Sequence, residues 1–368
     1  MTPALRIPGF LLRRPSADGS LVGALLILVG LGLVVLYSAT EADSGSVVRQ
    51  GIRFGVGAVV LVVFSQVPPQ MLRNWTPAAY LVSVVMLMVV AILGEGRGAQ
   101  RWLDLGFVRF QPSELMKLSL PMMLAWYLHR RQLPPRWIEL GVCLFLIAIP
   151  AGLIVRQPDL GTALLVGVSG VFVLFLAGLS WRIIGLLAAL GAAASPVLWH
   201  FMHDYQRARV LTLLNPEGDP LGRGWNIIQS KVAVGSGGLY GKGWQNGTQA
   251  HLDFLPESST DFILAVLAEE FGLVGVLILF GIYLFIIFRC LTIATLAKDT
   301  YGRLLAGALT MTFFVYVAVN AGMISGLLPV VGVPLPLVSY GGTSIVSLMA
   351  GFGIIMSIYG HRRFLKSR

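Results

Sequence analysis

The sequence predicts an all-α polytopic membrane protein with about ten transmembrane helices and a large, partly helical extracytoplasmic loop between helices 7 and 8. Of its 368 residues, 56% are hydrophobic and only 12% are charged, whereas soluble domains have roughly 25% charged residues. Apolar runs recur along the chain, each long enough to cross a bilayer core of about 30 Å. One polar segment, residues 200–261, interrupts them. We therefore expect a single integral membrane domain over residues 1–368.

Ten apolar runs are the predicted spans. In chain order they cover residues 21–38, 52–67, 77–94, 112–128, 138–155, 160–178, 182–199, 262–288, 304–326 and 342–360. Two of them carry helix-start signals, since Pro112 suits a first helical turn and Asp159 is placed to cap the helix that follows it. The first run follows Arg6, Arg13 and Arg14 as a signal peptide would, but no clear cleavage site follows it, so we expect a retained anchor.

The placement of Lys and Arg predicts that both termini face the cytoplasm. With that orientation, 15 of the 27 basic residues lie in inner segments, 11 in outer segments and Lys117 within a span. Five of the outer residues belong to 200–261, a segment long enough to be translocated regardless of charge. The net charge of +10 then serves orientation against anionic lipid, and we expect no nucleic-acid partner.

The 200–261 segment is too long for a passive turn in a compact bundle. Helix-like pieces alternate in it with turn-rich ones, which indicates a partly helical cap at the outer surface. Lys231 and Lys242 lie there beside Trp225, Tyr240 and Trp244. Cations with interfacial aromatic residues suit a phosphorylated lipid headgroup, but they also suit an ordinary membrane-surface loop, and the residues leave both interpretations open.

The glycines of this loop do not form a nucleotide-binding motif. Gly241-Lys242 lacks the upstream glycine of a phosphate-binding loop, and Gly235-x-Gly237 meets Tyr240 where a dinucleotide motif requires glycine. We therefore expect no nucleotide cofactor, and any chemistry must use a substrate that is already activated.

Charged residues within predicted spans are expensive and usually face a cavity or a partner. Glu114 and Lys117 are three residues apart and share a helix face, so they can neutralise each other. A structural ion pair and a cavity-lining role remain equally open. Glu269 and Glu270 point to different sides of their helix, and they cannot both serve one site with Asp261.

The stretch from 320 to 344 predicts a lined cleft near the outer face. It contains Pro329, Pro334 and Pro336 and then Gly341-Gly342. Broken backbone at membrane depth is tolerated only against protein or a water-filled cavity.

These stretches resemble the motifs of the SEDS family (shape, elongation, division and sporulation). The residues that carry the resemblance are GAQRWLDLGFVRFQPSELMKL, RQPDLGT, DPLGRGWNIIQSKVAVGSGGLYGKGW, FLPESSTDFILAVLAEEFG and LVSYGGTS. The likeness runs over nearly the whole chain. The sequences GAQRWLDLG, FLAGLSWR and HDYQRARV are more similar to the rod-shape branch of this family in Gram-negative bacteria than to its division branch.

The resemblance implies a peptidoglycan glycosyltransferase that polymerises lipid II during cell elongation, at the outer face of the bacterial cytoplasmic (inner) membrane. It implies partnership with a class B penicillin-binding protein and other membrane proteins of the elongation complex. Asp261 would be the essential acidic residue. The expected cavity and substrate-binding residues are Arg101, Arg109, Glu114, Lys117, Asp159, Lys231, Lys242, Ser339, Gly341 and Gly342.

Two roles for Asp261 remain open from the sequence: general base, or ligand of a divalent cation such as Mg²⁺ or Mn²⁺. Two other functions remain open as well. A lipid II flippase or transporter would also use charges within the membrane and broken helices, although we detect no clear internal repeat. A noncatalytic scaffold of the wall-synthesis complex would leave the carboxylates unexplained.

Overall fold

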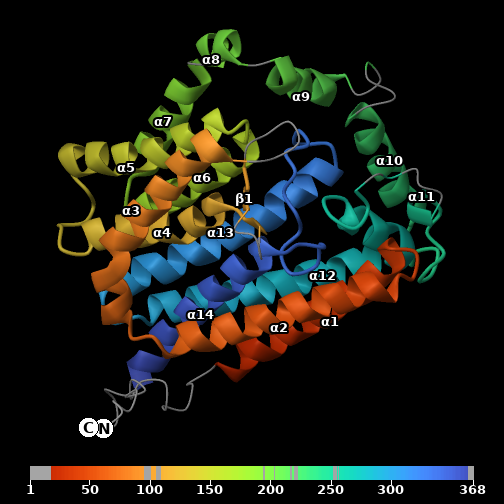
Figure 1. The fold of residues 1–368 in the computed structure, drawn as a ribbon, viewed down its shortest axis with the longest axis horizontal. Coiled ribbons are helices and arrows are strands. Elements are labelled where there is room, and N and C mark those ends of the chain that lie inside the picture. Colours follow the sequence, from red (N-terminus) through yellow and green to blue (C-terminus); the bar gives the residue numbers. More distant parts are fainter. Residues whose placement is uncertain are drawn as a thin grey trace.

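The computed structural model describes residues 18–94, 101–104, 109–193, 195–202, 204–215, 218, 223–251, 255 and 257–363. Within these ranges the chain is almost entirely helical (Figure 1). The helices are α1 (Gly19–Ala39), α2 (Ser44–Gln66), α3 (Pro69–Leu93), α4 (Pro112–Leu128), α5 (Trp137–Arg156), α6 (Leu160–Leu176), α7 (Trp181–Ala193), α8 (Ser195–Phe201), α9 (Asp204–Leu214), α10 (Arg223–Ser236), α11 (Thr248–His251), α12 (Ile263–Thr295), α13 (Thr300–Ile324) and α14 (Thr343–Arg363). A small antiparallel hairpin, β1 (Leu103–Asp104) with β2 (Arg109–Phe110), precedes α4.

All ten predicted spans coincide with helices. Nine match a single helix each, and the run 182–199 is divided between α7 and α8. Among the described residues, seven helices are long and apolar enough to cross a membrane, namely α1, α2, α3, α5, α12, α13 and α14. The helices α4 and α6 have 17 residues each, which is about 25 Å of helix.

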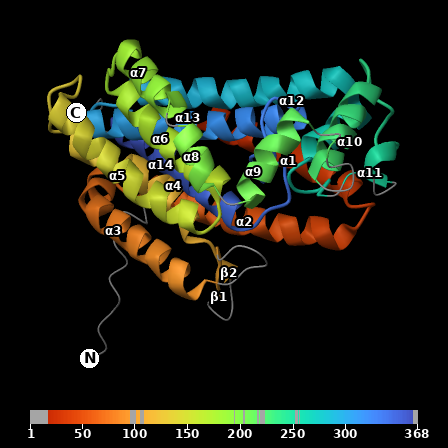
Figure 2. The same cartoon turned by 90° about the horizontal axis from the view of Figure 1, so that it is seen from above.

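The long helices form one bundle with a continuous apolar core. Figures 1 and 2 show α1, α2, α12, α13 and α14 side by side, with α3 to α7 covering one side of this group. Pairs packed along each other include α2 with α14, α12 with α13, and α13 with α4 and α6. The helices α13 and α14 are the most enclosed of the seven, because they have helices on several sides.

The first and last described residues lie at the same end of the bundle. Asp18 caps α1 and forms an ion pair of 2.5 Å with Arg289 in the last turns of α12. Arg289 is also within electrostatic reach of Tyr359 near the end of α14. This end carries the starts of α1, α3 and α13. Asp261 precedes the start of α12, whose last turns are at this end, so the expected site lies at the other end of the bundle.

The predicted extracytoplasmic segment is partly helical, as expected, and it docks on α12. This helix is broken at Gly272, whose φ of 64° and ψ of −163° are not helical. The amides of Lys242 and Gly243 donate to the carbonyls of Glu269 and Glu270, at 3.0 Å each. The carbonyls of residues 238 and 239 accept from the amides of residues 273 and 274 just beyond the break. The loop thus supplies hydrogen bonds that the interrupted helix cannot make for itself.

This docking demands glycine on both sides. A Cβ on Gly272 would lie 2.4 Å from the amide nitrogen of Gly241, and a Cβ on Gly241 would lie 2.1 Å from the carbonyl oxygen of Glu270. Both glycines also have positive φ, a conformation that other residues adopt only with strain. The glycine-rich sequence of the loop is therefore explained by its close backbone contact with α12.

Candidate active site

A polar cavity of about 240 Å³ lies where α4, α6 and α14 begin. The irregular 331–342 segment closes one side of it. Its described lining residues are Arg101, Trp102, Gln111, Glu114, Lys117, Asp159, Thr162, Leu165, Tyr316, Gly332, Val333, Pro334, Gly341, Gly342, Thr343 and Ser344. Of the expected residues, the structure brings together Arg101, Glu114, Lys117, Asp159, Gly341 and Gly342. The cleft predicted from the broken 320–344 stretch is confirmed.

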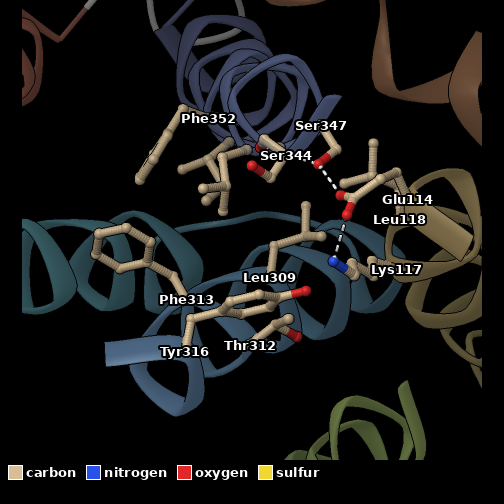
Figure 3. Close-up of a pocket in the computed structure, with 13 residues that line it drawn as sticks. Glu114, Lys117, Leu118, Leu309, Thr312, Phe313, Tyr316, Ser344, Ser347 and Phe352 are labelled. Atoms are coloured by element: carbon tan, nitrogen blue, oxygen red, sulfur yellow. Dashed lines mark hydrogen bonds and ion pairs between the residues drawn. The ribbon is translucent and has the colours of Figure 1, made fainter. Parts of the chain in front are cut away.

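Glu114 and Lys117 form the ion pair that their spacing predicts. The Lys117 Nζ donates to Glu114 Oε1 at 2.6 Å, and the Ser347 hydroxyl of α14 donates to Glu114 Oε2, also at 2.6 Å (Figure 3). The ammonium also lies 4.8 Å from the centre of the Tyr316 ring, a favourable cation–π geometry. Both charged side chains are buried and both line the cavity, so the structural and cavity-lining roles coexist.

Asp159 combines a capping role with a charge pair. Its carboxylate accepts from the Thr162 amide at 3.1 Å and from the Thr162 hydroxyl at 2.9 Å, which caps α6. Arg101 Nε lies 3.5 Å from the same carboxylate. The Arg101 guanidinium also donates to the carbonyl of Pro158 at 2.6 Å. These contacts fix Arg101 at the cavity wall.

Asp261 is not itself among the residues that line this cavity. It lies at the rim, beside the lining residue Gly332, in the turn 257–262 that leads into α12. A Cβ added to Gly332 would lie 3.5 Å from Asp261 Oδ2, so the carboxylate rests against the backbone of a cavity-lining residue. Gly332 has a φ of +75°, so any larger residue there would be strained.

Hydrogen bonds from two other segments hold the Asp261 turn. The Asn320 amide of α13 donates to the carbonyl of Asp261 at 2.9 Å and to that of Val333 at 2.7 Å. The Ser339 hydroxyl donates to the carbonyl of Thr260 at 2.5 Å and accepts from the amide of Leu335 at 2.8 Å. These contacts fix the turn through main-chain carbonyls and do not use the carboxylate oxygens of Asp261.

The Asp261 side chain is poised to exchange a proton near neutral pH. Burial raises the pKa of Asp261 to about 6, and repulsion from Glu257 adds to the rise, while the Arg209 guanidinium opposes it. A general base works best when its pKa is close to the operating pH. Arg209 belongs to α9, so the 200–261 segment contributes directly to the electrostatics of the site.

Three expected residues are not part of the cavity wall that the structure describes. Ser339 is buried and acts on the Asp261 turn. Lys231 is exposed on α10, and its Nζ lies so close to Gly326 that a Cβ there would be 2.6 Å away. Lys242 is bound to Glu269 at 2.6 Å. For Arg109, the backbone pairs with Asp104 in the hairpin, and its side chain lies outside the described part of the structure.

The two glutamates of α12 anchor other segments to this helix. The Glu269 carboxylate accepts from Lys242 Nζ at 2.6 Å, from the Thr248 amide at 2.8 Å and from the Thr248 hydroxyl at 2.9 Å. Glu270 accepts a hydrogen bond from the Ser38 hydroxyl of α1. As expected, the two side chains serve different sides of α12, and neither belongs to the cavity wall described above.

An apolar pocket of about 40 Å³ continues from the polar cavity (Figure 3). The two share Glu114, Lys117, Tyr316 and Ser344. The remaining lining is mainly apolar and comes from α4, α13 and α14, with Leu118, Leu309, Phe313, Leu348, Phe352 and Ile355. The lining of the site therefore changes from charged side chains in the polar cavity to mainly apolar side chains in the adjoining pocket.

Sequence reasoning missed several residues that shape the site. Asn320 carried a usable signal, because it is a buried amide in an otherwise apolar run. Arg53 of α2 also had one, as a cation at the edge of a predicted span. Its guanidinium stacks on Tyr340 at 4.3 Å from the ring centre, and a Cβ on Gly342 would lie 3.9 Å from its Nε. Arg209 had no signal that set it apart from other loop cations.

A resident metal centre is not built from the described residues, in which no three His, Cys, Asp or Glu side chains gather closely enough to hold an ion. Asp261 has Glu257 within electrostatic reach. Magnesium is commonly held by one or two carboxylates together with substrate phosphates. The residues present therefore fit a divalent cation that binds jointly with a phosphorylated substrate.

Fold and cavity together define a multi-pass membrane protein with a polar, carboxylate-bearing site at one end of its bundle. The profile of the cell cycle proteins FtsW, RodA and SpoVE matches residues 19–364. The chain therefore belongs to this family, which is the one the sequence motifs resemble.

Similar proteins agree with this assignment. The chain is 54% identical over 350 residues to the peptidoglycan glycosyltransferase MrdB of Escherichia coli K12, with 95% of both chains covered. It is 35% identical to MrdB of Helicobacter pylori J99, covering 92% of this chain and 89% of that one. Among solved structures, it matches the rod-shape-determining protein RodA of Thermus thermophilus with a TM-score of 0.72 and 30% identity, covering 94% of this chain and 98% of that one.

A second solved structure describes the "structural coordination of polymerization and crosslinking by a peptidoglycan synthase complex". One of its chains matches with a TM-score of 0.83 and 32% identity, covering 94% of this chain and 98% of that one.

Proposed function

We propose that this chain polymerises lipid II into glycan strands at the outer face of the bacterial cytoplasmic membrane, with Asp261 as the general base. That the chain is a peptidoglycan glycosyltransferase follows from its 54% identity, over 95% of its length, to enzymes of that name. The observation that carries the assignment to Asp261 is its place at the cavity rim, with main-chain contacts holding its turn and a pKa raised to about 6.

The proposed reaction is a single displacement. Asp261 takes the proton from the 4-hydroxyl of the acceptor N-acetylglucosamine. That oxygen forms a bond to C1 of the donor N-acetylmuramic acid, and the bond from C1 to the undecaprenyl diphosphate breaks, so the diphosphate leaves with the electron pair. The donor linkage is α and the product linkage is β, which one displacement with inversion explains. A general base contributes roughly 10²- to 10⁴-fold in rate.

The departing diphosphate needs positive charge beyond what the described cavity wall offers. Arg101 and Lys117 face the cavity, but each is paired with a carboxylate, Asp159 and Glu114 respectively, so the formal charge of these four groups is zero. A divalent cation, Mg²⁺ or Mn²⁺, held by the substrate phosphates would supply charge to the leaving group and leave Asp261 to accept the proton. Arg53 and Arg209 border the site and can add to it.

The apolar pocket beside the charged cavity does not accommodate the lipid part of the substrate. The charged cavity continues into the apolar pocket between α4, α13 and α14. That pocket, at about 40 Å³, is too small for an isoprenoid chain, so we expect only a methyl-sized group to enter it without movement of the helices.

We further propose that both termini face the cytoplasm and that a class B penicillin-binding protein is the partner. The excess of Lys and Arg in the inner segments supports the orientation. The likeness to a chain of a peptidoglycan synthase complex supports the partner.

The test is polymerisation of purified, labelled lipid II by this chain in detergent, with and without the partner, whose transpeptidase is blocked by penicillin. Divalent ions are supplied in one arm and chelated in the other. We expect glycan strands on a gel from the wild-type chain and none from Asp261→Asn. Polymer from the Asn variant would remove the role given to Asp261. No polymer from any wild-type arm would favour the flippase or scaffold alternatives.

A further inference from the structure

A second polar cavity, of about 220 Å³, lies at the end of the bundle opposite Asp261. It is enclosed by the first turn of α3, the connection between α12 and α13, and the last turns of α14. Its lining residues are Pro69, Gln70, Arg73, Lys298, Asp299, Ile358 and His361. None of these residues takes part in the site described above, and the proposed reaction does not use them.

Two helices start at this cavity. The helix α3 begins at Pro69 and α13 at Thr300, and each has 25 residues. The N-cap residues, Pro68 and Asp299, make no side-chain capping hydrogen bond. At the start of α3, Pro69 has no amide hydrogen and the amides of Met71 and Leu72 bond to the Pro68 carbonyl, so α13 supplies most of the amide groups without a side-chain acceptor. Each helix start also carries about half a positive charge, which is a setting that favours an anion.

The ionisable side chains add a net positive charge to the two helix starts. Arg73 and Lys298 carry one charge each and Asp299 removes one, so the lining is +1 with His361 neutral and +2 with it protonated. Among the described ion pairs of 4.0 Å or less, none joins Asp299 to Arg73 or Lys298. The His361 Nδ1 bonds to the Ser357 carbonyl at 2.9 Å, which holds the ring at the cavity.

We propose that this cavity binds the phosphodiester of an anionic phospholipid from the adjacent leaflet. Basic pockets between transmembrane helices are suited to phospholipid headgroups. On α3, Met71 and Trp75 are 40% and 64% exposed, on the side of the helix opposite Arg73. A Trp at this depth is typical of the membrane interface, which places the cavity at the level of the lipid headgroups. The leaflet is cytoplasmic in the orientation proposed above, which is tested separately.

Free phosphate shares the chemistry that the cavity recognises, and the membrane setting favours the lipid. The cavity lies at the ends of α3 and α14, both long and apolar enough to cross a membrane, so it faces the layer in which lipid phosphates are concentrated. An occupant of this kind would tie the start of α3 to the start of α13 through one phosphate group.

The experiment compares lipid binding by native mass spectrometry of the purified full chain. The cavity variant is Arg73→Gln with Lys298→Gln. The matched control is Arg136→Gln with Arg182→Gln, which removes two exposed cations at the starts of α5 and α7, away from this cavity. Each protein is titrated with phosphatidylglycerol and, separately, with phosphatidylcholine.

We expect the wild-type and control proteins to retain one phosphatidylglycerol that the cavity variant loses, with an apparent affinity about 30-fold weaker in that variant, since each cation near a membrane surface contributes roughly 1 kcal/mol. Phosphatidylcholine should bind less tightly in every case. Asp299→Asn should bind phosphatidylglycerol more tightly than the wild type, and this arm does not depend on the folding of the cavity variant.

Equal retention of phosphatidylglycerol by the wild-type and cavity-variant proteins would overturn the proposal. So would weaker binding by Asp299→Asn. In a further arm, inorganic phosphate alone is tested for protection of the wild-type chain against thermal unfolding. Protection by phosphate with no additional effect of phosphatidylglycerol would assign the cavity to the free anion. Loss of partner association in the cavity variant, with lipid binding unchanged, would assign it to an acidic protein segment.

Discussion

Replacing Asp261 by Asn should make the protein more stable at neutral pH while abolishing glycan synthesis. Asn is nearly isosteric, and the hydrogen bonds that hold the turn use the Asp261 carbonyl, which the substitution keeps. What changes is the ionised carboxylate. The pKa of Asp261 is raised from 3.8 to about 6, chiefly by burial, so ionisation is less favourable in the folded protein than in the unfolded chain.

The size of the effect follows from the shift of the pKa. A pKa raised from 3.8 to about 6 corresponds to roughly 3 kcal/mol of free energy of unfolding that the native protein forgoes at a pH well above 6. This destabilisation is fully present above about pH 6, is roughly halved near pH 5 and vanishes below the unfolded pKa of about 3.8. The Asn amide must also leave water, so the net gain of the variant is smaller than this upper value.

The assay is thermal unfolding in detergent, followed by tryptophan fluorescence, at about pH 8 and about pH 5 on both sides of the shifted pKa. We expect the Asn variant to unfold several degrees above the wild type at the higher pH, with the difference shrinking at the lower pH. Polymerisation of lipid II, measured on the same samples, should be lost. A variant that is less stable at both values, or a difference that does not shrink on acidification, would refute the argument.

Three further outcomes are expected. Glu257→Gln removes a like charge beside Asp261, so the pKa of Asp261 should fall and the acid limb of the polymerisation profile should move to lower pH; an upward movement would contradict this. Glu114→Gln or Lys117→Met alone should each destabilise by about 3–5 kcal/mol, because one buried charge is left unpaired, while the double variant should lose less in thermal unfolding; simple additivity would show that the pair is not coupled. Glu269→Gln should weaken the anchor of the extracytoplasmic loop and raise its hydrogen exchange, with little change in exchange elsewhere; unchanged exchange in the loop would show that the carboxylate does not hold it.

Much of the fold was predictable from the sequence, because membrane helices are local features. The length and hydropathy of a run decide whether it can span a bilayer, and all ten predicted runs are helical. The contact of Glu114 with Lys117 was also predictable, since residues three apart share a helix face. The capping role of Asp159 depends on the amide of Thr162, three residues further on.

The contacts that complete the site join distant segments, and no local pattern specifies them. Asp261 meets Gly332, and Ser339 meets Thr260, only because α12, α13 and the 331–342 segment pack together. The sequence could not indicate that Ser339 holds a turn instead of facing the cavity. It likewise could not show that Lys242 is bound to Glu269, because that pairing depends on the loop folding back onto the broken helix.

The break at Gly272 divides α12 into a short segment that leads back to Asp261 and the longer remainder of the helix. Asp261 precedes Gly272 by eleven positions, of which the part from Ile263 is about 14 Å of helix and the remainder belongs to the turn before it. The 200–261 segment is hydrogen-bonded to the backbone on both sides of the break, and Asp261 lies at the far end of this piece, where Asn320 holds its carbonyl. A rotation of about 10° at the break would displace the carboxylate by roughly 3 Å, whereas catalytic groups must be held to within about 0.5 Å. The bonds of the 200–261 segment to both sides of the break therefore help to fix where the Asp261 carboxylate lies.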